Sequence, residues 1–375
     1  MTYKLAPFAP PRRLLMGPGP SDVAPEVLAA MSHPVIGHLD PAFLMIMDET
    51  MEALRHIFRT RNRMTLPMSG AGSLGMETAA QNLLEPGDRI VVGVCGVFGA
   101  RLADMSRRTG AEVDVVEAEW GRPVDPEALD RALSKAPVKA LAIVHVETST
   151  GVMQKLEDIV ALTRKHGCLL VVDAVASLGG MSLDVDGFGI DVCYSGSQKC
   201  LSAPPGLSPI TLSERAVAAI RARKTPVRSW YVDLVQLDKY WGGDRVYHHT
   251  APVSMVYALR EALRMVLDEG LDARIARHLA AHRSLAAGLP GVGLEFFTEE
   301  RHRPPVINAV RIPTGLDARS EKALRRRLLD EEGIEIAGGL GPMAGKIWRI
   351  GLMGHSARTE NVERLLAALR RLLGR

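Results

Sequence analysis

Two short apolar runs, each leading to one ionisable side chain, constrain the fold of this chain more than any other feature. The first run, Cys168 to Val172, is followed by Asp173. The second, Ile190 to Tyr194, leads through a small polar turn to Lys199. Short continuous apolar runs are typical of buried parallel strands, and open α/β sheets bind ligands at the carboxyl ends of their strands. The pattern predicts that a carboxylate and an amine meet in one crevice.

Each of these two groups gains a specific chemistry in such a crevice. A lysine in a partly desolvated pocket has a lowered pKa, so it can act as a nucleophile or base near neutral pH. An acid that faces a pyridine nitrogen keeps the ring protonated, as in enzymes that use pyridoxal 5'-phosphate (PLP) as an electron sink. The spacing alone leaves a plainer interpretation open, in which the lysine lies on the surface and the aspartate caps a helix.

A glycine-rich turn from Gly70 to Gly75 follows a short strand and begins a helix. Its G-x-G-x-x-G spacing would suit a dinucleotide-binding fold, which also needs an acid after the second strand to hold a ribose. That strand, Arg89 to Val94, runs instead into Cys95 and Gly96. Free N–H groups at a helix N-terminus can bind a single phosphate. The turn therefore favours a monophosphate such as PLP over a dinucleotide.

Composition argues against several other classes of protein. A formal net charge of +3, without a basic block interleaved with aromatic residues, gives no support to nucleic-acid binding. There is no apolar run of roughly 18 residues, so no membrane-spanning helix is expected. The four cysteines have no C-x-x-C spacing, which favours a reducing, cytoplasmic location. The pair His248-His249 lacks a third ligand at metal spacing, so no metal site is predicted.

Strand and helix patterns alternate along the chain, which predicts a mostly parallel sheet with right-handed crossovers. Ser21-Asp22 is expected to cap a helix that starts near Val23. A helical pattern from Pro252 to His282, broken at Gly270, would connect this part to a smaller α+β unit. In that unit, strands are expected near Gly293–Phe297 and Val306–Arg311. The predicted division of the 375 residues is an N-terminal arm at 1–20, a large domain at 21–268 and a small domain at 269–375.

Several strings in order resemble one known family. YSGSQK and APPG, with VDAVASLGG upstream, resemble the alanine–glyoxylate and serine–pyruvate aminotransferases, a class V branch of the fold-type I PLP enzymes. Matching segments run from GPGP at Gly17 to WRIGLMG at Trp348, nearly the whole chain. The resemblance implies an α/β fold with a seven-stranded, mostly parallel sheet in a large domain and a smaller C-terminal α+β domain. It also implies ping-pong transfer of an amino group from alanine or serine to glyoxylate or pyruvate.

The resemblance assigns roles in a cofactor site residue by residue. It implies that Lys199 binds PLP as a Schiff base and moves the proton of the substrate Cα. Asp173 would keep the ring nitrogen protonated, and Thr148 would hydrogen-bond the cofactor. Val175 and Phe98 would sandwich the ring, although the family often has tryptophan where this chain has Phe98. The phosphate-binding residues implied are Ala71, Gly72, Ser73, Gln198, Tyr247 and Thr250.

Further residues are implied for the substrate and for a partner subunit. Arg349 lies between apolar residues in a predicted strand, and an inward-facing arginine needs an anion. The resemblance makes that anion the substrate carboxylate, held in two parallel hydrogen bonds, while an internal salt bridge is the open alternative. His38 would lie on the substrate side. Tyr247 and Thr250 would reach across a homodimer into the partner's site, and only the resemblance implies that dimer.

Other functions stay open from the sequence. The chain also resembles the (S)-ureidoglycine–glyoxylate aminotransferases of purine catabolism, notably around GKIWRIG. That branch is expected to have amide side chains near the substrate entrance, where this chain has His38 and Tyr247. A cysteine desulfurase would place histidine before the lysine, at the position of Gln198. A dinucleotide oxidoreductase lacks its ribose acid. A catalytically silent binding protein is the least favoured, because the lysine, the acid and the arginine are all present.

Overall fold

A seven-stranded sheet forms the centre of residues 3–374, the part of the chain that the computed structural model describes. Its strand order is β2-β10-β9-β8-β5-β3-β4. The strands are β2 Met64–Met68, β3 Arg89–Val94, β4 Glu112–Glu117, β5 Ala140–Val144, β8 Leu169–Asp173, β9 Val192–Tyr194 and β10 Ser208–Leu212. Strand β10 is antiparallel to both of its neighbours, and the other pairs are parallel. The predicted seven-stranded, mostly parallel sheet is confirmed.

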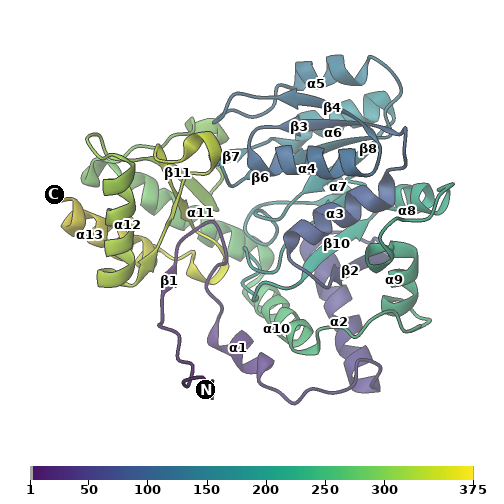
Figure 1. Cartoon of the computed structure of the whole chain (residues 1–375), viewed down its shortest axis with the longest axis horizontal. Helices are drawn as coiled ribbons and strands as arrows, with labels where there is room; N and C mark the ends of the chain where they lie inside the picture. The colour runs from purple at the N-terminus through teal and green to yellow at the C-terminus, as the bar shows by residue number, and fades with distance from the viewer. Residues whose placement is uncertain (1–2, 375) are drawn as a thin grey trace.

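Helices connect these strands and surround the sheet (Figure 1). They are α2 Pro41–Phe58, α3 Gly72–Leu83, α4 Val97–Arg108, α5 Pro126–Leu133, α6 Leu156–His166, α7 Val185–Phe188, α8 Glu214–Arg221 and α9 Leu234–Trp241. Local chemistry sets several of their ends. Helix α2 begins where the Asp40 side chain accepts the N–H of Ala42, and α6 ends at Gly167, whose φ of 66° suits glycine. Within residues 3–374, no helix combines the length and the apolar character that a bilayer crossing requires.

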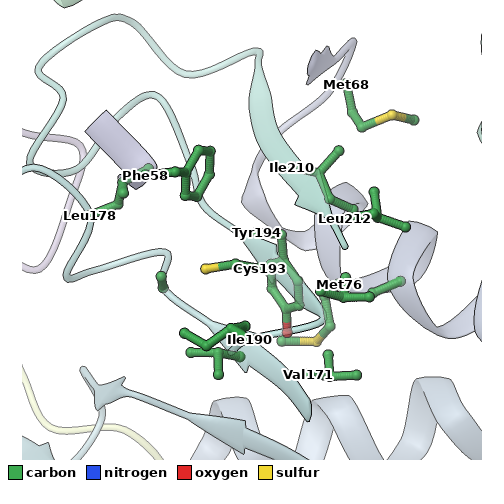
Figure 2. Close-up of a cluster of buried hydrophobic side chains, with 14 of the residues drawn as sticks. Phe58, Met68, Met76, Val171, Leu178, Ile190, Cys193, Tyr194, Ile210 and Leu212 are labelled. Atoms are coloured by element: carbon green, nitrogen blue, oxygen red, sulfur yellow. The ribbon is translucent and has the colours of Figure 1, made fainter. Parts of the chain in front are cut away.

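The sheet and its helices share one continuous apolar core, which reaches the carboxyl ends of the strands. Tyr194, the last residue of β9, is fully buried there. Figure 2 shows it within a cluster of buried side chains that also includes Met76 of α3, Ile190 and Val171. Close packing of this kind holds side chains in single positions. This packing therefore fixes the ends of β8 and β9, which carry Asp173 and lead to Lys199.

The C-terminal part has its own sheet and its own apolar core, to one side of the large sheet in Figure 1. Its elements are α11 Leu271–Gly288, β11 Ile307–Arg311, α12 Ala318–Glu332, β12 Ile334–Glu335, β13 Ala337–Gly338, β14 Ile347–Gly351 and α13 Thr359–Leu373. The preceding helix, α10 Val253–Glu269, packs into the core of the large sheet instead. The helical break expected at Gly270 is present, with a φ of 82°. The strand expected at Gly293–Phe297 is wrong, because a 3-10 turn ends at left-handed Gly293 and leaves only an isolated bridge from Phe296 to Val310. The domain boundaries themselves stay a prediction.

The N-terminal segment is held by distant parts of its own chain. Strand β1 (Leu14–Leu15) pairs in parallel with β12 of the C-terminal part. Helix α1 (Pro25–Met31) has Ala24 at its N-cap, so the cap expected from Ser21-Asp22 is wrong. The Ser21 hydroxyl instead donates to the carbonyl oxygen of Lys199 at 2.7 Å, and Asp22 accepts the N–H of Leu15 at 3.1 Å. Tertiary hydrogen bonds took the place of the local cap.

Short elements complete the connections. They are the strand pair β6 Val146–Glu147 and β7 Val152–Met153, and the 3-10 turns Trp230–Val232, Pro290–Val292, Glu300–His302, Gly341–Met343 and Gly354–Ser356. Strands β6 and β7 follow β5 directly, so they project the chain over the carboxyl edge of the sheet. This places Thr148 and its neighbours close to the ends of β5 and β8.

Candidate active site

A cavity of about 200 Å³ lies at the carboxyl ends of β5, β8 and β9. It collects side chains from five segments that are far apart in sequence. The predicted site residues that line it are Ala71, Gly72, Ser73, Phe98, Thr148, Asp173, Val175, Gln198 and Lys199. The lining residues that sequence analysis missed are Met76, Arg101, Val144, Val146 and Ala176. Open α/β sheets bind ligands at this edge, so the cavity is the candidate active site.

Lys199 is the buried amine of this cavity. Burial lowers its pKa from 10.5 to about 8, and the positive charge of Arg349 acts in the same direction, while Cys200 and Asp173 oppose it. Its Nζ donates to the carbonyl oxygen of Pro18, which the N-terminal segment brings over the cavity. A lysine with this pKa is partly neutral near pH 8, and a neutral amine is the form that attacks a carbonyl carbon.

Asp173 is the buried acid of the same cavity. Burial raises its pKa from 3.8 to about 7, although the N–H of Val175 donates to its Oδ1 at 2.9 Å and favours the charged form. The carboxylate of Glu147 adds to the increase. A protonated pyridine nitrogen would replace the lost solvation of this carboxylate with a direct ionic hydrogen bond. The pocket around Asp173 therefore suits a cationic ring partner.

The start of α3 forms the other end of the cavity. Its N-cap residue, Ala71, provides no side-chain cap, so the first N–H groups of the helix are left for another acceptor. Gly72 lies tightly against Val175, because a Cβ on it would come within 3.1 to 3.2 Å of the valine methyl groups. Small residues thus bring the backbone close to the cavity. A helix N-terminus of this kind can receive a phosphate, so the residues present fit a phosphorylated pyridine.

Arg349 lies in the middle of β14, and only 6% of its surface is exposed. Its Nε donates to the carbonyl oxygen of Gly338 at 2.8 Å, and Nη1 donates to that of Thr148 at 3.4 Å. No carboxylate among residues 3–374 forms an ion pair with it, so the internal salt bridge left open above is not observed in that part of the chain. Burial lowers its pKa to about 10, which leaves it charged at neutral pH. The guanidinium can therefore receive an anion.

Glu147 is a buried acid next to the cavity that sequence analysis missed. It accepts the N–H groups of Phe98 at 3.0 Å and Gly99 at 3.1 Å, together with the N–H of Ser149 at 3.1 Å. It therefore caps α4 from another element and fixes the position of Phe98. Gly96 makes room for it, because a Cβ there would come within 2.5 Å of the glutamate side chain. The available signal was an acid directly after an apolar strand, the same pattern that marked Asp173.

His38, Tyr247 and Thr250 do not line this cavity within the single chain. The ring of His38 lies 5.2 Å from that of Tyr247, and 58% of the tyrosine surface is exposed. Thr250 is exposed as well. The sequence analysis assigned Tyr247 and Thr250 to the site of a partner subunit, so a single chain does not test their role.

Comparison with known proteins gives the family. A model of the class-V aminotransferases matches residues 14–365. This chain belongs to the class-V aminotransferases.

Individual relatives of this class-V aminotransferase match over nearly the whole chain. The (S)-ureidoglycine–glyoxylate transaminase of Bacillus subtilis is 44% identical, over 97% of this chain and 91% of the relative. The alanine–glyoxylate aminotransferase of Drosophila melanogaster is 43% identical, over 97% and 93%. A crystal structure of alanine–glyoxylate aminotransferase from Nostoc sp. has a TM-score of 0.96 and 47% identity, covering 99% of this chain and 98% of that one.

Membership in this family establishes the reaction class and the cofactor. The protein is a transaminase and its cofactor is PLP. The family resemblance, the fold and the cofactor expected from the sequence are all confirmed. The roles of individual residues in the cavity stay predictions, which the geometry above supports.

Proposed function

We propose that this transaminase moves an amino group from a small amino acid, alanine or serine, to glyoxylate, with pyruvate as a second acceptor. The observation that carries the proposal is the meeting of Lys199 and Asp173 in one cavity, both with pKa values shifted by burial toward neutrality. Alanine–glyoxylate aminotransferases are among the relatives that match nearly the whole chain.

Lys199 and Asp173 would divide the proton chemistry between them. PLP supplies an electron sink and carries the amino group from donor to acceptor. Lys199 would hold the cofactor covalently and then, as a free amine with a pKa of about 8, take up and return the proton at the substrate Cα. Asp173 would keep its own charge opposite the ring nitrogen and hold the proton there. Donor and acceptor would use one site in turn, which predicts ping-pong kinetics.

The remaining cavity residues would hold the cofactor and the substrate in place. Phe98 and Val175 would face the two sides of the ring, and Thr148 would hydrogen-bond the cofactor. Arg349 would orient the substrate carboxylate through its planar fork, and its missing ion-pair partner among residues 3–374 supports that role. The phosphate would be bound by Ala71, Gly72, Ser73 and Gln198.

We also propose that the enzyme acts as a homodimer. Tyr247 and Thr250 would complete the phosphate site of the partner subunit, and His38 would lie on the substrate side. The support is the exposure of Tyr247 and Thr250 in the single chain, together with the neighbouring exposed aromatic rings of Trp230 and Tyr231. Exposed apolar groups that gather on one face are typical of protein interfaces.

The alternative function is (S)-ureidoglycine–glyoxylate transamination. The observation that favours it is the Bacillus subtilis relative, whose 44% identity is close to the 43% of the Drosophila melanogaster alanine–glyoxylate aminotransferase. Glyoxylate is the acceptor in both names, so the two proposals differ in the amino donor. His38 and Tyr247, in place of the amide side chains expected near the entrance of that branch, lead us to rank it second.

One panel of substrates tests both proposals. Purified enzyme with PLP would be assayed with alanine, serine and (S)-ureidoglycine as donors, each against glyoxylate and pyruvate. The proposal expects the highest kcat/KM for alanine or serine with glyoxylate, and parallel lines in double-reciprocal plots. A clear preference for ureidoglycine would establish the alternative. Absence of amino transfer to both oxo acids would reject both.

A reducing, cytoplasmic location is a further part of the proposal. Its support is that all four cysteines are buried as free thiols. Cell fractionation with an antibody against the native protein would test it. Recovery of the enzyme from an oxidising compartment would contradict it.

A further inference from the structure

Arg101 lies at the rim of the cavity, on the second turn of α4, and the roles proposed so far leave it unused. Its Nη1 donates a hydrogen bond to the hydroxyl oxygen of Ser73 at 3.2 Å. Its guanidinium carbon lies 4.9 Å from the centre of the Phe98 ring. Two predicted cofactor-binding residues therefore hold this cation at the end of the cavity where the phosphate is expected.

The charges around the cavity show why a cation is needed there. A phosphate monoester carries about −1.5 to −2 charges at neutral pH. The residues proposed to bind it, Ala71, Gly72, Ser73 and Gln198, are all neutral, and so are Tyr247 and Thr250. Asp173, at the opposite end, is acidic. The amine of Lys199 would be bonded to the aldehyde carbon of the cofactor, so it would not pair with the phosphate. Helix N–H groups provide only a partial positive charge. The predicted set therefore leaves most of the phosphate charge unbalanced.

Arg101 is free to supply this charge. Among residues 3–374 no carboxylate lies within 4.0 Å of its guanidinium, whereas Arg108, on the same helix, pairs with Asp104 at 2.8 Å. Stacking on Phe98 limits the positions that the guanidinium can take without neutralising it. The Ser73 hydroxyl accepts from Arg101, so its own proton remains available to a second acceptor. Arg101 and Ser73 therefore each retain a hydrogen-bond donor for a phosphate oxygen.

We propose that Arg101 binds the phosphate of PLP and that Ser73 links the arginine to it. The inference rests on the proposed position of the phosphate at the start of α3, and it adds a charged residue to a set that was otherwise neutral. Arg101 donates charge-assisted hydrogen bonds to the phosphate, while Phe98 contacts the guanidinium and the cofactor ring. Loss of this side chain weakens binding of a phosphorylated ligand and spares the same ligand without its phosphate.

The experiment compares PLP with pyridoxal, which has the same ring and aldehyde but lacks the phosphate. Dissociation constants would be measured by absorbance for the cofactor-free forms of wild type, Arg101→Gln, Arg101→Lys and Arg107→Gln. Arg107 is the matched control, because it is an exposed arginine of the same helix that does not line the cavity. We expect Arg101→Gln to weaken PLP binding by roughly tenfold and no more, since Arg101 is exposed to solvent, and to change pyridoxal binding less than about twofold. Arg101→Lys retains most of the affinity, and Arg107→Gln equals wild type.

A second readout is independent of the covalent bond to Lys199. Inorganic phosphate should raise the Tm of the cofactor-free wild type and of Arg107→Gln, and this increase should be lost in Arg101→Gln. Equal weakening of PLP and pyridoxal would show that Arg101 only holds Phe98 in place, and would overturn the proposal. PLP affinity of Arg101→Gln equal to that of Arg107→Gln would also overturn it. If wild type itself bound PLP no better than pyridoxal, the phosphate position under the proposed function would be wrong instead.

Discussion

The cavity with Lys199 and Asp173 and the segment with Tyr247 and Thr250 differ in what surrounds their polar groups. In the cavity, the chain itself buries both ionisable groups, and their pKa values move toward neutrality. The Tyr247 side chain is mostly exposed. Burial by the same chain prepares groups for chemistry at neutral pH, whereas exposure leaves groups available to another molecule. Under the proposed dimer, one chain would hold the reacting groups and a second chain would complete the site.

Among the residues of these two regions, replacement of Lys199 by alanine should cause the largest loss of activity. The variant should lose the visible absorbance of lysine-bound cofactor, and transamination should fall by roughly 10⁴-fold or more, because nucleophile and proton carrier disappear together. Absorbance spectra and steady-state rates measure both. The exposed Lys224→Ala is the control. Retention of the absorbance and the activity would end the assignment of Lys199.

Replacement of Asp173 by asparagine should lower activity by roughly 10² to 10⁴-fold, because the ring nitrogen loses its ionic partner. The same change should stabilise the cofactor-free protein at pH 8. An acid with a raised pKa destabilises the folded chain as pH rises from its ordinary 3.8 to its folded value of about 7, and the full cost remains above that.

Thermal unfolding of the cofactor-free Asp173→Asn protein measures this stability effect. The gain should reach roughly 2 to 4 kcal/mol at pH 8 and vanish below about pH 3, where the carboxyl is protonated in both states. The exposed Asp244→Asn should show no such dependence on pH. A variant that is less stable than wild type at pH 8 would mean that the buried carboxylate already has a compensating partner.

Replacement of Arg349 by alanine should mainly raise KM for substrates with a carboxylate, by roughly 10- to 100-fold, because two charge-assisted hydrogen bonds are lost. Steady-state kinetics with alanine, and with alaninamide, which lacks the carboxylate, separate the contribution of the carboxylate from that of the rest of the substrate. Wild type should prefer alanine strongly, and the variant should show little preference. Arg349→Lys should recover part of the affinity, since it keeps the charge but not the planar fork. An unchanged KM for alanine and glyoxylate would remove this role.

Replacement of Tyr247 by alanine should have the smallest effect, a loss of PLP affinity of about tenfold or less, because one neutral hydrogen bond is removed. The adjacent exposed Val246→Ala is the control. A mixture of Lys199→Ala and Tyr247→Ala chains gives a sharper test. If Tyr247 acts in the partner's site, each hybrid dimer contains one intact site, and sites with wild-type PLP affinity should be recovered on mixing, measured as activity at limiting PLP. No recovery on mixing, with dimers confirmed by light scattering, would place Tyr247 outside the partner's site.

Local sequence patterns predicted the regular elements with few errors. The bounds expected for the strand at 89–94 and the helical break expected at Gly270 match the structure, because periodicity and glycine breaks act over neighbouring residues. The errors at Ser21-Asp22 and at Gly293–Phe297 have a common origin. In the first case a partner 178 residues away took the serine hydroxyl, and in the second a left-handed glycine turn took most of the expected strand.

The sequence by itself determined that an acid and a lysine follow adjacent buried strands, and that a glycine-rich turn lies ready for a phosphate. These features are local, since a strand has a direction and its last residues point to one edge of the sheet. Only the tertiary structure decided which other groups join them. Arg349 reaches Thr148 across 201 residues, Glu147 caps a helix 49 residues earlier, and Arg101 meets Ser73 across 28. Such contacts depend on how separate elements pack, and no spacing within a single segment encodes them.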